Sequence, residues 1–149
     1  MEPLSILRSP PVVVLASLAA QRLLSRGSST SPATSLLGAA VAAAGLGVAA
    51  AGIREIRAAG TTLDPTRPAD ASKVVRQGIY RYSRNPIYLG DALLLAGYAI
   101  HRRDLLAILP VAGFVGVIDT FQVSAEEEAL RDRFGSTYGD YVVSVRRWL

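Results

Sequence analysis

The chain has 149 residues, of which 50% are apolar, 19% are charged and none is a cysteine. This length predicts a single domain, and the missing cysteines exclude a disulfide scaffold, a cysteine zinc site and a cysteine nucleophile. Sixteen Lys and Arg residues outnumber twelve Asp and Glu residues, a balance that suits nucleic acid or an anionic membrane surface. The mean hydropathy of +0.31 favours the membrane over nucleic acid. The single histidine argues against a metal site.

Two apolar runs lie in the first third of the chain. Val12–Leu24 is short and contains Arg22, and Leu4–Pro11 would lengthen it into a membrane span. A secretory signal is the alternative for this run. Ser35–Ile53 carries no charge, and as a helix it measures about 28 Å, close to the hydrocarbon thickness of a bilayer. We expect both runs to be transmembrane helices.

Two further apolar runs follow, and each contains an aspartate. Ile87–Ile100 contains Asp91, and Leu105–Phe121 contains Asp119 near its end. The short charged turn His101–Asp104 joins them, so we expect a helical hairpin within the membrane. The sequence therefore predicts an all-α integral membrane protein with about four transmembrane helices.

The remaining segments are more polar. Gly60–Asp70 is typical of a loop, and Val74–Arg84 of an amphipathic segment at the membrane interface. Ala125–Arg133 predicts a helix that continues the fourth span and ends at Gly135. Tyr138–Trp148 predicts a last amphipathic helix.

Four spans would place the N-terminus, the central loop and the C-terminus on one side of the membrane. That side would carry twelve of the sixteen Lys and Arg residues, so the positive-inside rule places it in the cytoplasm. In a bacterium the membrane would be the inner membrane. The single domain 1–149 then divides into the first two helices (1–58), a cytoplasmic loop (59–86), the hairpin (87–121) and the C-terminal helices (122–149).

Small residues recur four positions apart in the second run. The pairs are Gly38/Ala42, Gly45/Ala49 and Gly47/Ala51. Pairs of this kind let two helix backbones approach closely. They predict packing within the chain, with an oligomer interface as the alternative.

Asp119, Gln122 and Glu126 are three and four positions apart, so a helix would place them on one face. A charge at the centre of a membrane helix costs about 2.5–3.5 kcal/mol on insertion scales, which makes such residues candidates for function. This acidic face could bind a cation or accept a proton. The alternative is that Asp119 pairs with an arginine and that Glu126 begins a solvated helix. Spacing alone leaves both interpretations open.

Tyrosines gather around the sequence Arg84-Asn85-Pro86, which Tyr80 and Tyr88 flank. Their rings could form a cage for a cationic group, each contributing roughly 0.5–2 kcal/mol. An aromatic belt at the membrane interface is the alternative, and we favour it for Tyr82. Pro86 disfavours helix at the preceding residue, which suggests either a ligand site or a proline in the first turn of a helix.

Two motifs resemble those of one family. Residues 78–90, GIYRYSRNPIYLG, resemble the pattern G-x-Y-x-x-x-R-[HN]-P-x-Y-x-G of the isoprenylcysteine carboxyl methyltransferase and phospholipid methyltransferase superfamily. Residues 126–147 resemble its C-terminal pattern E-E-x-x-L-x-x-x-F-G-x-x-Y-x-x-Y followed by V-x-R. Gly60-Thr61-Thr62 and Pro65 resemble the loop that precedes the first motif. The resemblance covers about residues 55–149.

The resemblance implies an integral-membrane methyltransferase that binds S-adenosylmethionine in a cytoplasm-facing pocket, closed by the region after the last span. Glu126 would hold a polar end of the cofactor, and Asp119 and Gln122 would lie on the substrate side. Carried over by position, the implied cofactor-binding residues are Ser72, Lys73, Val74, Val75, Gly78, Tyr80, Arg84, Asn85, Pro86, Tyr88, Gly90, Glu126 and Glu127.

Two positions depart from the isoprenylcysteine enzymes that the chain resembles. Gln122 stands where those enzymes have an arginine for the substrate carboxylate, and Asn85 stands where they have a histidine. We therefore expect methyl transfer to a lipophilic acceptor that is an isoprenoid carboxylate, a phospholipid amine or a small amphiphile. Asp119 could accept a proton from an amine or a hydroxyl. The alternative function is a non-catalytic membrane scaffold.

Overall fold

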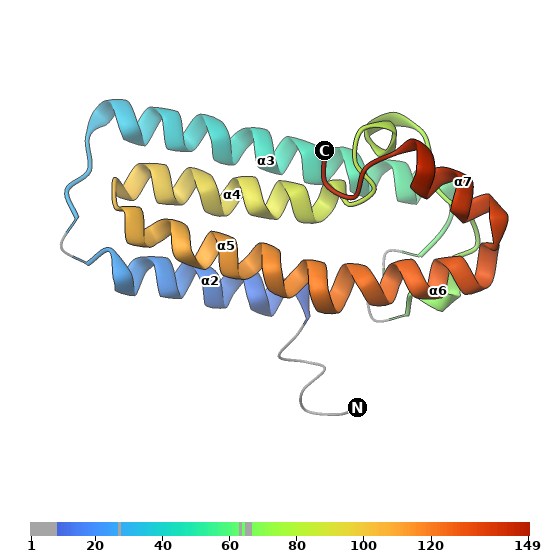
Figure 1. Cartoon of the computed structure of the whole chain (residues 1–149). Coiled ribbons are helices and arrows are strands. Elements are labelled where there is room, and N and C mark those ends of the chain that lie inside the picture. Colours follow the sequence, from blue (N-terminus) through green and yellow to red (C-terminus); the bar gives the residue numbers. More distant parts are fainter. Residues whose placement is uncertain (1–8, 27, 63, 65–66) are drawn as a thin grey trace.

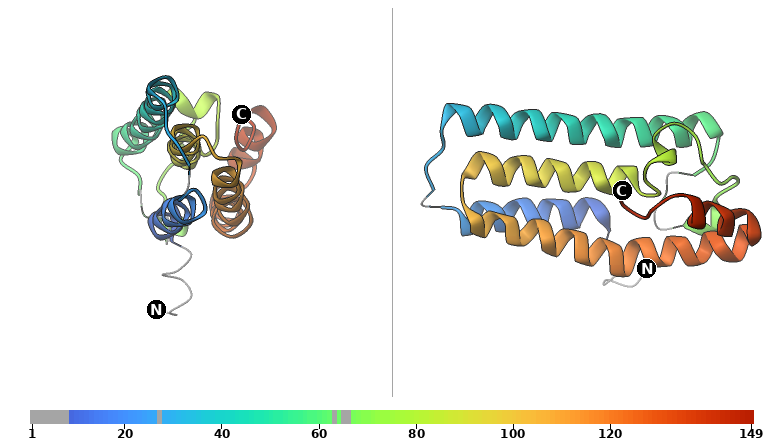
Figure 2. Two further views of the ribbon diagram at one scale, coloured as in Figure 1. Left: turned by 90° about the vertical axis from the view of Figure 1, so that its left-hand side faces the viewer. Right: turned by 45° about the horizontal axis from the view of Figure 1, so that its top comes forward.

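Regular structure in the part of the chain described here, residues 9–26, 28–62, 64 and 67–149, is entirely helical (Figure 1). In this computed structural model four helices lie side by side along one axis, as both views of Figure 2 confirm. They are α2 (Pro10–Leu24), α3 (Pro32–Ala59), α4 (Pro86–Arg102) and α5 (Leu109–Val117). The predicted all-α class is confirmed for these residues. Leu4–Arg8 of the predicted extension of the first span, and Pro65, lie outside the described residues.

The second predicted span is longer than the apolar run alone indicates. Helix α3 begins after a capping box, in which Ser31 and Thr34 exchange hydrogen bonds between side chain and backbone N–H. It ends at Gly60, whose φ of 67° is the left-handed conformation that commonly stops a helix. Six residues of helix thus follow Ile53, and they carry Arg54, Glu55 and Arg57 beyond the apolar stretch.

The fourth predicted span and the helix after it form one continuous rod from Leu105 to Phe134. The rod consists of a 3-10 turn η3 (Leu105–Ile108), helix α5, a π-helical turn η4 (Ile118–Val123) and helix α6 (Ser124–Phe134). The prediction that a polar helix continues the span is confirmed. The rod and α3 are long and apolar enough to cross a membrane. Helices α2 and α4 have 15 and 17 residues, so their crossing stays a prediction.

Glycines bring α3 and α4 into close contact. A Cβ atom on Gly90 of α4 would lie 2.5 Å from the carbonyl oxygen of Gly45 in α3, and one on Gly97 would lie 2.5 Å from that of Gly38. Ala42 and Ala49 border the same contact, so two of the three small-residue pairs pack within the chain. At Gly47, no atom of the described residues lies within 4 Å of where a Cβ would be.

One expectation about local structure is wrong. Helix α7 covers Ser136–Ser144 and stops well before Trp148, because Val145 is extended and the chain turns back toward Arg84. The segment Val74–Arg84, expected to be amphipathic, contains the 3-10 turn η2 (Gly78–Arg81), which begins at Gly78 with positive φ. Another 3-10 turn, η1 (Pro68–Asp70), lies in the loop before it.

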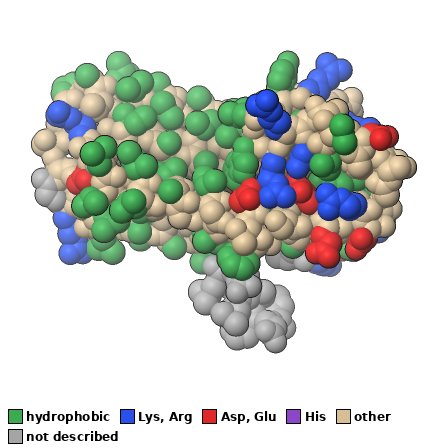
Figure 3. Space-filling model, in the orientation of Figure 1, with side chains coloured by type: hydrophobic (Ala, Val, Ile, Leu, Met, Phe, Trp, Pro, Cys, Tyr) green, Lys and Arg blue, Asp and Glu red, His purple; other side chains and the backbone are tan. Residues whose placement is uncertain are grey.

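Charges and apolar side chains separate along the molecule. The face shown in Figure 3 has apolar side chains over the four parallel helices and charged side chains at the two ends. Large apolar side chains remain exposed on α2, α3 and α5, including Leu15, Leu46 and Leu109, whereas the apolar residues of α4 are buried or partly buried. A soluble domain rarely exposes so continuous an apolar surface, so this distribution suits contact with lipid.

Candidate functional site

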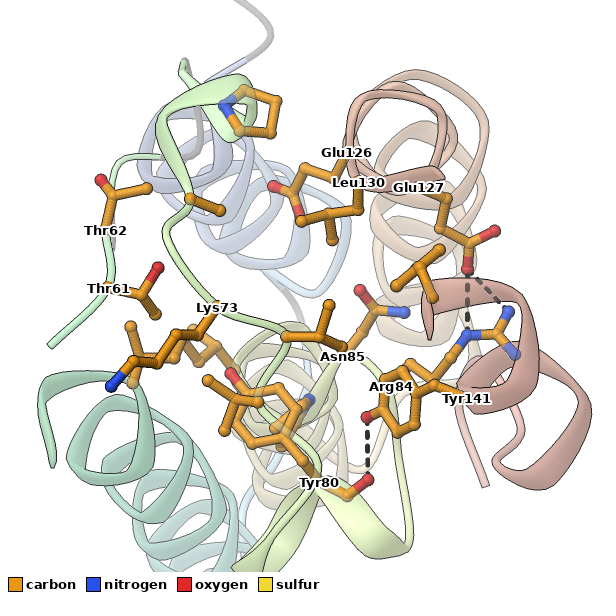
Figure 4. A pocket seen from close by; sticks show the side chains of 18 of the residues that line it. Thr61, Thr62, Lys73, Tyr80, Arg84, Asn85, Glu126, Glu127, Leu130 and Tyr141 are labelled. Atoms are coloured by element: carbon orange, nitrogen blue, oxygen red, sulfur yellow. Dashed lines mark hydrogen bonds and ion pairs between the residues drawn. The ribbon is translucent and has the colours of Figure 1, made fainter. Parts of the chain in front are cut away.

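A pocket lies at the end of the molecule where α6 and α7 project beyond the parallel helices (Figure 4). Its walls come from the end of α3, the loop before η2, the start of α4, and helices α6 and α7. The predicted residues that line it are Lys73, Val74, Val75, Tyr80, Arg84, Asn85, Pro86, Tyr88, Glu126 and Glu127. The fold thus brings the two motifs of the sequence into one cavity.

Three of the predicted cofactor-binding residues lie outside the lining. Ser72 holds the loop, because its N–H donates to Thr61 Oγ1 over 2.9 Å and its hydroxyl to the Gly60 carbonyl over 3.2 Å. Gly78 has φ +58°, and a Cβ there would collide with Glu55 at 2.5 Å. Gly90 faces α3. Each of these three residues therefore has a structural role that explains its presence without a ligand.

Glu126 connects the two motifs. The Tyr88 hydroxyl donates to Glu126 Oε1 over 2.5 Å, and Gln122 Nε2 donates to the same oxygen over 2.7 Å. Pro86 occupies the first position of α4, so the proline interpretation as a helix start is correct and Tyr88 follows within the first turn. Glu126 thus presents a carboxylate to the pocket with one oxygen already hydrogen-bonded.

Glu127 is held by two arginines from other parts of the chain. Arg84 Nη2 lies 2.7 Å from Glu127 Oε1, and Arg147 Nη2 lies 2.8 Å from Oε2. Arg84 also donates to the carbonyls of Val142 (3.1 Å) and Val145 (2.6 Å), so it fastens the C-terminal segment to the first motif. Burial alone would raise the pKa of Glu127, but the hydrogen bonds from both arginines outweigh it and lower that pKa.

Asp119 pairs with an arginine, which was the alternative to a role in binding a cation or accepting a proton. Arg147 Nη1 donates to one of its carboxylate oxygens over 3.0 Å, and Trp148 Nε1 donates to the other over 2.8 Å. Asp119 and Gln122 both lie in the π-helical turn, and of these two Gln122 is the one that hydrogen-bonds Glu126. The predicted stripe therefore divides: Gln122 contacts Glu126 at the edge of the pocket, and Asp119 contacts the C-terminal segment. Asp119 and Gln122 do not line the pocket.

Three tyrosines form a second wall. Tyr80, Tyr138 and Tyr141 pack together in a buried cluster, and the Tyr141 hydroxyl donates to the Tyr80 carbonyl over 2.8 Å. Burial, followed by the charge of Glu127, raises the pKa of Tyr138 to about 12. Burial likewise raises the pKa values of Tyr80 and Tyr141. All three hydroxyl groups therefore stay protonated at neutral pH, and the rings offer faces and O–H donors to the cavity.

Comparison with known proteins identifies the family. The model of the phospholipid methyltransferase family, PEMT, matches residues 33–137. The chain belongs to this family. An uncharacterised protein of Haemophilus influenzae is 40% identical over 63 residues, which are 42% of this chain and 100% of that protein. No solved structure matches the chain. Membership of the phospholipid methyltransferase family supports methyltransferase activity on lipid-type substrates.

The pocket also contains residues that the prediction of site residues missed. Tyr138 and Tyr141 are fixed positions of the second motif of the phospholipid methyltransferase family, so the motif could have been used to predict them. Thr61 and Thr62 lie in the loop that resembles the family's, and Leu130 is a fixed position of the second motif. No motif or spacing in the sequence identifies Asp64 as a pocket residue. Only the path of the loop between α3 and η2 brings it to the cavity.

Proposed function

We propose that the protein transfers methyl groups from S-adenosylmethionine to a lipophilic or membrane-associated acceptor. The observation that carries this proposal is the hydrogen bond from Tyr88 to Glu126, which joins the two family motifs across one cavity. When bound, the cofactor would supply a methyl group attached to a positively charged sulfur atom.

The donor set of the cavity fits this cofactor. Aromatic faces at Tyr80, Tyr88 and Tyr141 suit a sulfonium cation, and the Glu126 carboxylate suits an ammonium group or ribose hydroxyls. Lys73 supplies a cation for the carboxylate of the cofactor's amino acid part. Glu127 is engaged by Arg84 and Arg147, so we assign it to closing the cavity. Ser72, Gly78 and Gly90 are assigned to the architecture around it.

Methyl transfer by displacement depends on alignment and on exclusion of water more than on a strong acid or base. Arg84 and Asn85 serve this end by hydrogen bonds to the carbonyls of Val145 and Arg147, which hold the C-terminal segment against the start of α4. Asp119 fastens the same segment through Arg147 and Trp148. Its carboxylate is thereby occupied, and we assign it to positioning.

We propose further that all four parallel helices cross the membrane and that the pocket faces the cytoplasm. Of the two charged ends, the one that contains the pocket carries the excess of Lys and Arg, which the positive-inside rule would place in the cytoplasm. In a bacterium this would be the inner membrane. The scaffold alternative would explain the helices, but it gives no reason for a carboxylate and tyrosines gathered in a cavity.

The test is equilibrium binding of S-adenosylmethionine and S-adenosylhomocysteine to the detergent-purified protein. Glu126→Gln should weaken binding of both about tenfold or more, because it removes a charge from a charge-assisted hydrogen bond. Tyr88→Ala should weaken binding as well. Asp132→Asn is the matched control, since Asp132 is exposed on α6 away from the lining, and should bind as the wild type does. Absence of binding by the wild type in detergent and in lipid nanodiscs would overturn the proposal in favour of the scaffold.

A further inference from the structure

One irregular turn divides the rod that leads to the second motif. The π-helical turn η4 lies between α5 and α6. A π turn closes its hydrogen bonds one residue later than an α turn, so it takes up one extra residue in the helix. Such single turns inside α-helices are rare and lie frequently at functional sites. This turn ends shortly before Glu126, so it sets how α6 is rotated relative to α5.

The extra residue decides which of two adjacent glutamates faces the pocket. Each residue turns a regular α-helix by about 100°, so Glu126, seven positions after Asp119, would lie within about 20° of the same face. With one residue taken up by the π turn, Glu127 comes within about 20° of Asp119 instead, and Glu126 turns about 120° away. Figure 4 agrees with this count, since it shows Glu126 directed into the cavity and Glu127 toward Arg84.

One guanidinium group spans the π turn. Arg147 Nη1 lies 3.0 Å from Asp119 Oδ2, and Arg147 Nη2 lies 2.8 Å from Glu127 Oε2. Arg147 Nε also donates to Glu127 Oε1 over 3.2 Å. Trp148 Nε1 donates to the other carboxylate oxygen of Asp119 over 2.8 Å. Because the guanidinium is a planar fork, it fixes the position of one carboxylate relative to the other, which a point charge would not do.

The side chains of α6 do not by themselves select this rotation. Glu126 and Glu127 carry the same carboxylate at neighbouring positions. If the π turn relaxed to a regular helix, α6 would turn by about 100° and would present Glu126 to Arg147 in place of Glu127. The pocket would then lose the carboxylate that meets the Tyr88 hydroxyl. The contact of Arg147 with Asp119, on the other side of the turn, opposes this change.

We propose that Arg147 is a positioning residue of the cofactor pocket. By holding Asp119 and Glu127 on one face across the π turn, it keeps the Glu126 carboxylate directed into the pocket. Arg147 does not line the pocket, so it acts through α6. The inference rests on the proposed function for the ligand that Glu126 meets, but the rotation of α6 can be measured without that ligand.

Binding of S-adenosylhomocysteine to the full chain in nanodiscs, measured by calorimetry, tests the inference. Arg147→Gln should weaken binding about tenfold, the effect of losing one charge-assisted hydrogen bond at Glu126. Arg147→Lys keeps the charge but has no planar fork, so it should also bind several-fold more weakly than the wild type. Wild-type affinity in either variant would overturn the inference.

Arg146→Gln is the matched control. Arg146 is exposed and makes no ion pair with other described residues, and its neighbour in the sequence is the residue under test. It should bind S-adenosylhomocysteine as the wild type does. A loss equal to that of Arg147→Gln would show that any arginine of the C-terminal segment suffices, and would overturn the inference.

Deletion of Thr120 separates positioning from general stability. Thr120 is exposed within the π turn, and a chain one residue shorter there can form a regular α-helix with Glu127 still on the face of Asp119. The helix itself would then direct Glu126 into the pocket. Adding Arg147→Gln to this deletion should therefore weaken binding far less than it does in the full chain. Equal losses in the two backgrounds would overturn the inference, because a residue that only stabilises the fold would cause both.

Amide hydrogen exchange gives a readout that needs no cofactor. Arg147→Gln should speed exchange several-fold in peptides that cover η4 and the start of α6, and should leave α3 and α4 at the wild-type rate. Unchanged exchange at η4, or faster exchange throughout the chain, would overturn the inference. If Arg147→Gln does not fold, Trp148→Phe removes one hydrogen bond to Asp119 and keeps an aromatic ring. It should speed exchange in the same peptides, and unchanged exchange would then decide against the inference.

The two proposals fail separately. A protein that binds S-adenosylhomocysteine equally well as the wild type and as Arg147→Gln contradicts only the positioning role of Arg147. A wild type that does not bind S-adenosylmethionine or S-adenosylhomocysteine, together with faster exchange at η4 in Arg147→Gln, contradicts only the proposed function.

Discussion

Arg84 carries a buried guanidinium group whose partners lie on α6 and at the end of α7. It pairs with Glu127 on α6 and donates to two carbonyls near the end of α7, with only 8% of its side chain exposed. Arg84→Ala would leave two carbonyls unsatisfied and one carboxylate with a single arginine. We expect a loss of about 3 kcal/mol in the free energy of unfolding, the order found when a buried ion pair loses one partner. Denaturant unfolding in detergent measures it.

Arg54 provides the control for this prediction. Its side chain is 77% exposed, and among the described residues its ion pair is the one with neighbouring Glu55, over 3.3 Å. Arg54→Ala should therefore change the free energy of unfolding by less than about 0.5 kcal/mol. Similar losses in the two variants would contradict the special role of Arg84.

Glu127 should make the protein sensitive to acid. Hydrogen bonds from two arginines hold the pKa of Glu127 below its usual value despite burial. A carboxyl group with a lowered pKa in the folded state stabilises the fold at pH values above its ordinary pKa, and this contribution is lost as the pH falls through the lowered pKa. We expect the wild type to lose thermal stability between about pH 5 and pH 3.

Glu127→Gln provides the comparison. It should be less stable than the wild type at pH 7, because both arginines lose their anionic partner. Its melting temperature should change less than that of the wild type over the same range. Parallel pH profiles for the two proteins would show that other carboxylates cause the acid sensitivity.

At the scale of helices, the contact between α3 and α4 depends on glycine. A Cβ on Gly90 would lie 2.5 Å from the Gly45 carbonyl oxygen and 2.7 Å from the Ala49 side chain. Gly90→Ala should therefore force the helices apart and destabilise the protein by about 1–3 kcal/mol, the usual cost of overpacking. Thermal unfolding in detergent measures this loss.

Gly47→Ala, on the partner helix α3, is the matched control. A Cβ at Gly47 would meet no atom of the described residues within 4 Å, so alanine should be neutral or stabilise by up to about 1 kcal/mol through its higher helix propensity. If Gly47→Ala destabilised as much as Gly90→Ala, helix packing would not be the cause.

The helices could be predicted from the sequence because apolar runs and end signals are local. Pro86 and Gly135 mark where α4 begins and where α6 ends. The π-helical turn could not be predicted, since no residue type specifies it. Its consequence is large, because Asp119 lies at its start and meets Arg147 and Trp148 at the far end of the chain.

The site could be predicted only in part for the same reason. Motif positions indicate which residues gather, and most of the expected residues line one cavity. Motifs do not show which side chains are already engaged. Glu127 and Glu126 are adjacent, yet arginines hold one while Tyr88 and Gln122 hydrogen-bond to the other. Long-range contacts of this kind become visible only in the folded structure.

At the scale of the whole molecule, the two ends differ in charge and in structure. The connection before α3 lies at one end of the parallel helices, and α7 lies at the other (Figure 1). If the four helices cross the membrane, these ends face opposite compartments. Because the chain has no cysteine, single cysteines can report this orientation without background.

Ser29 before α3 and Ser136 at the start of α7 are both exposed, and each can be replaced by cysteine. In intact spheroplasts of a bacterial host, a membrane-impermeant maleimide should label Ser29→Cys and should label Ser136→Cys only after permeabilisation. This follows from the positive-inside rule, since α7 lies at the end with the excess of arginine. Labelling of Ser136→Cys alone would invert the topology and place the pocket away from cytoplasmic cofactor. Labelling of both in intact cells would show that the helices between them do not separate two compartments.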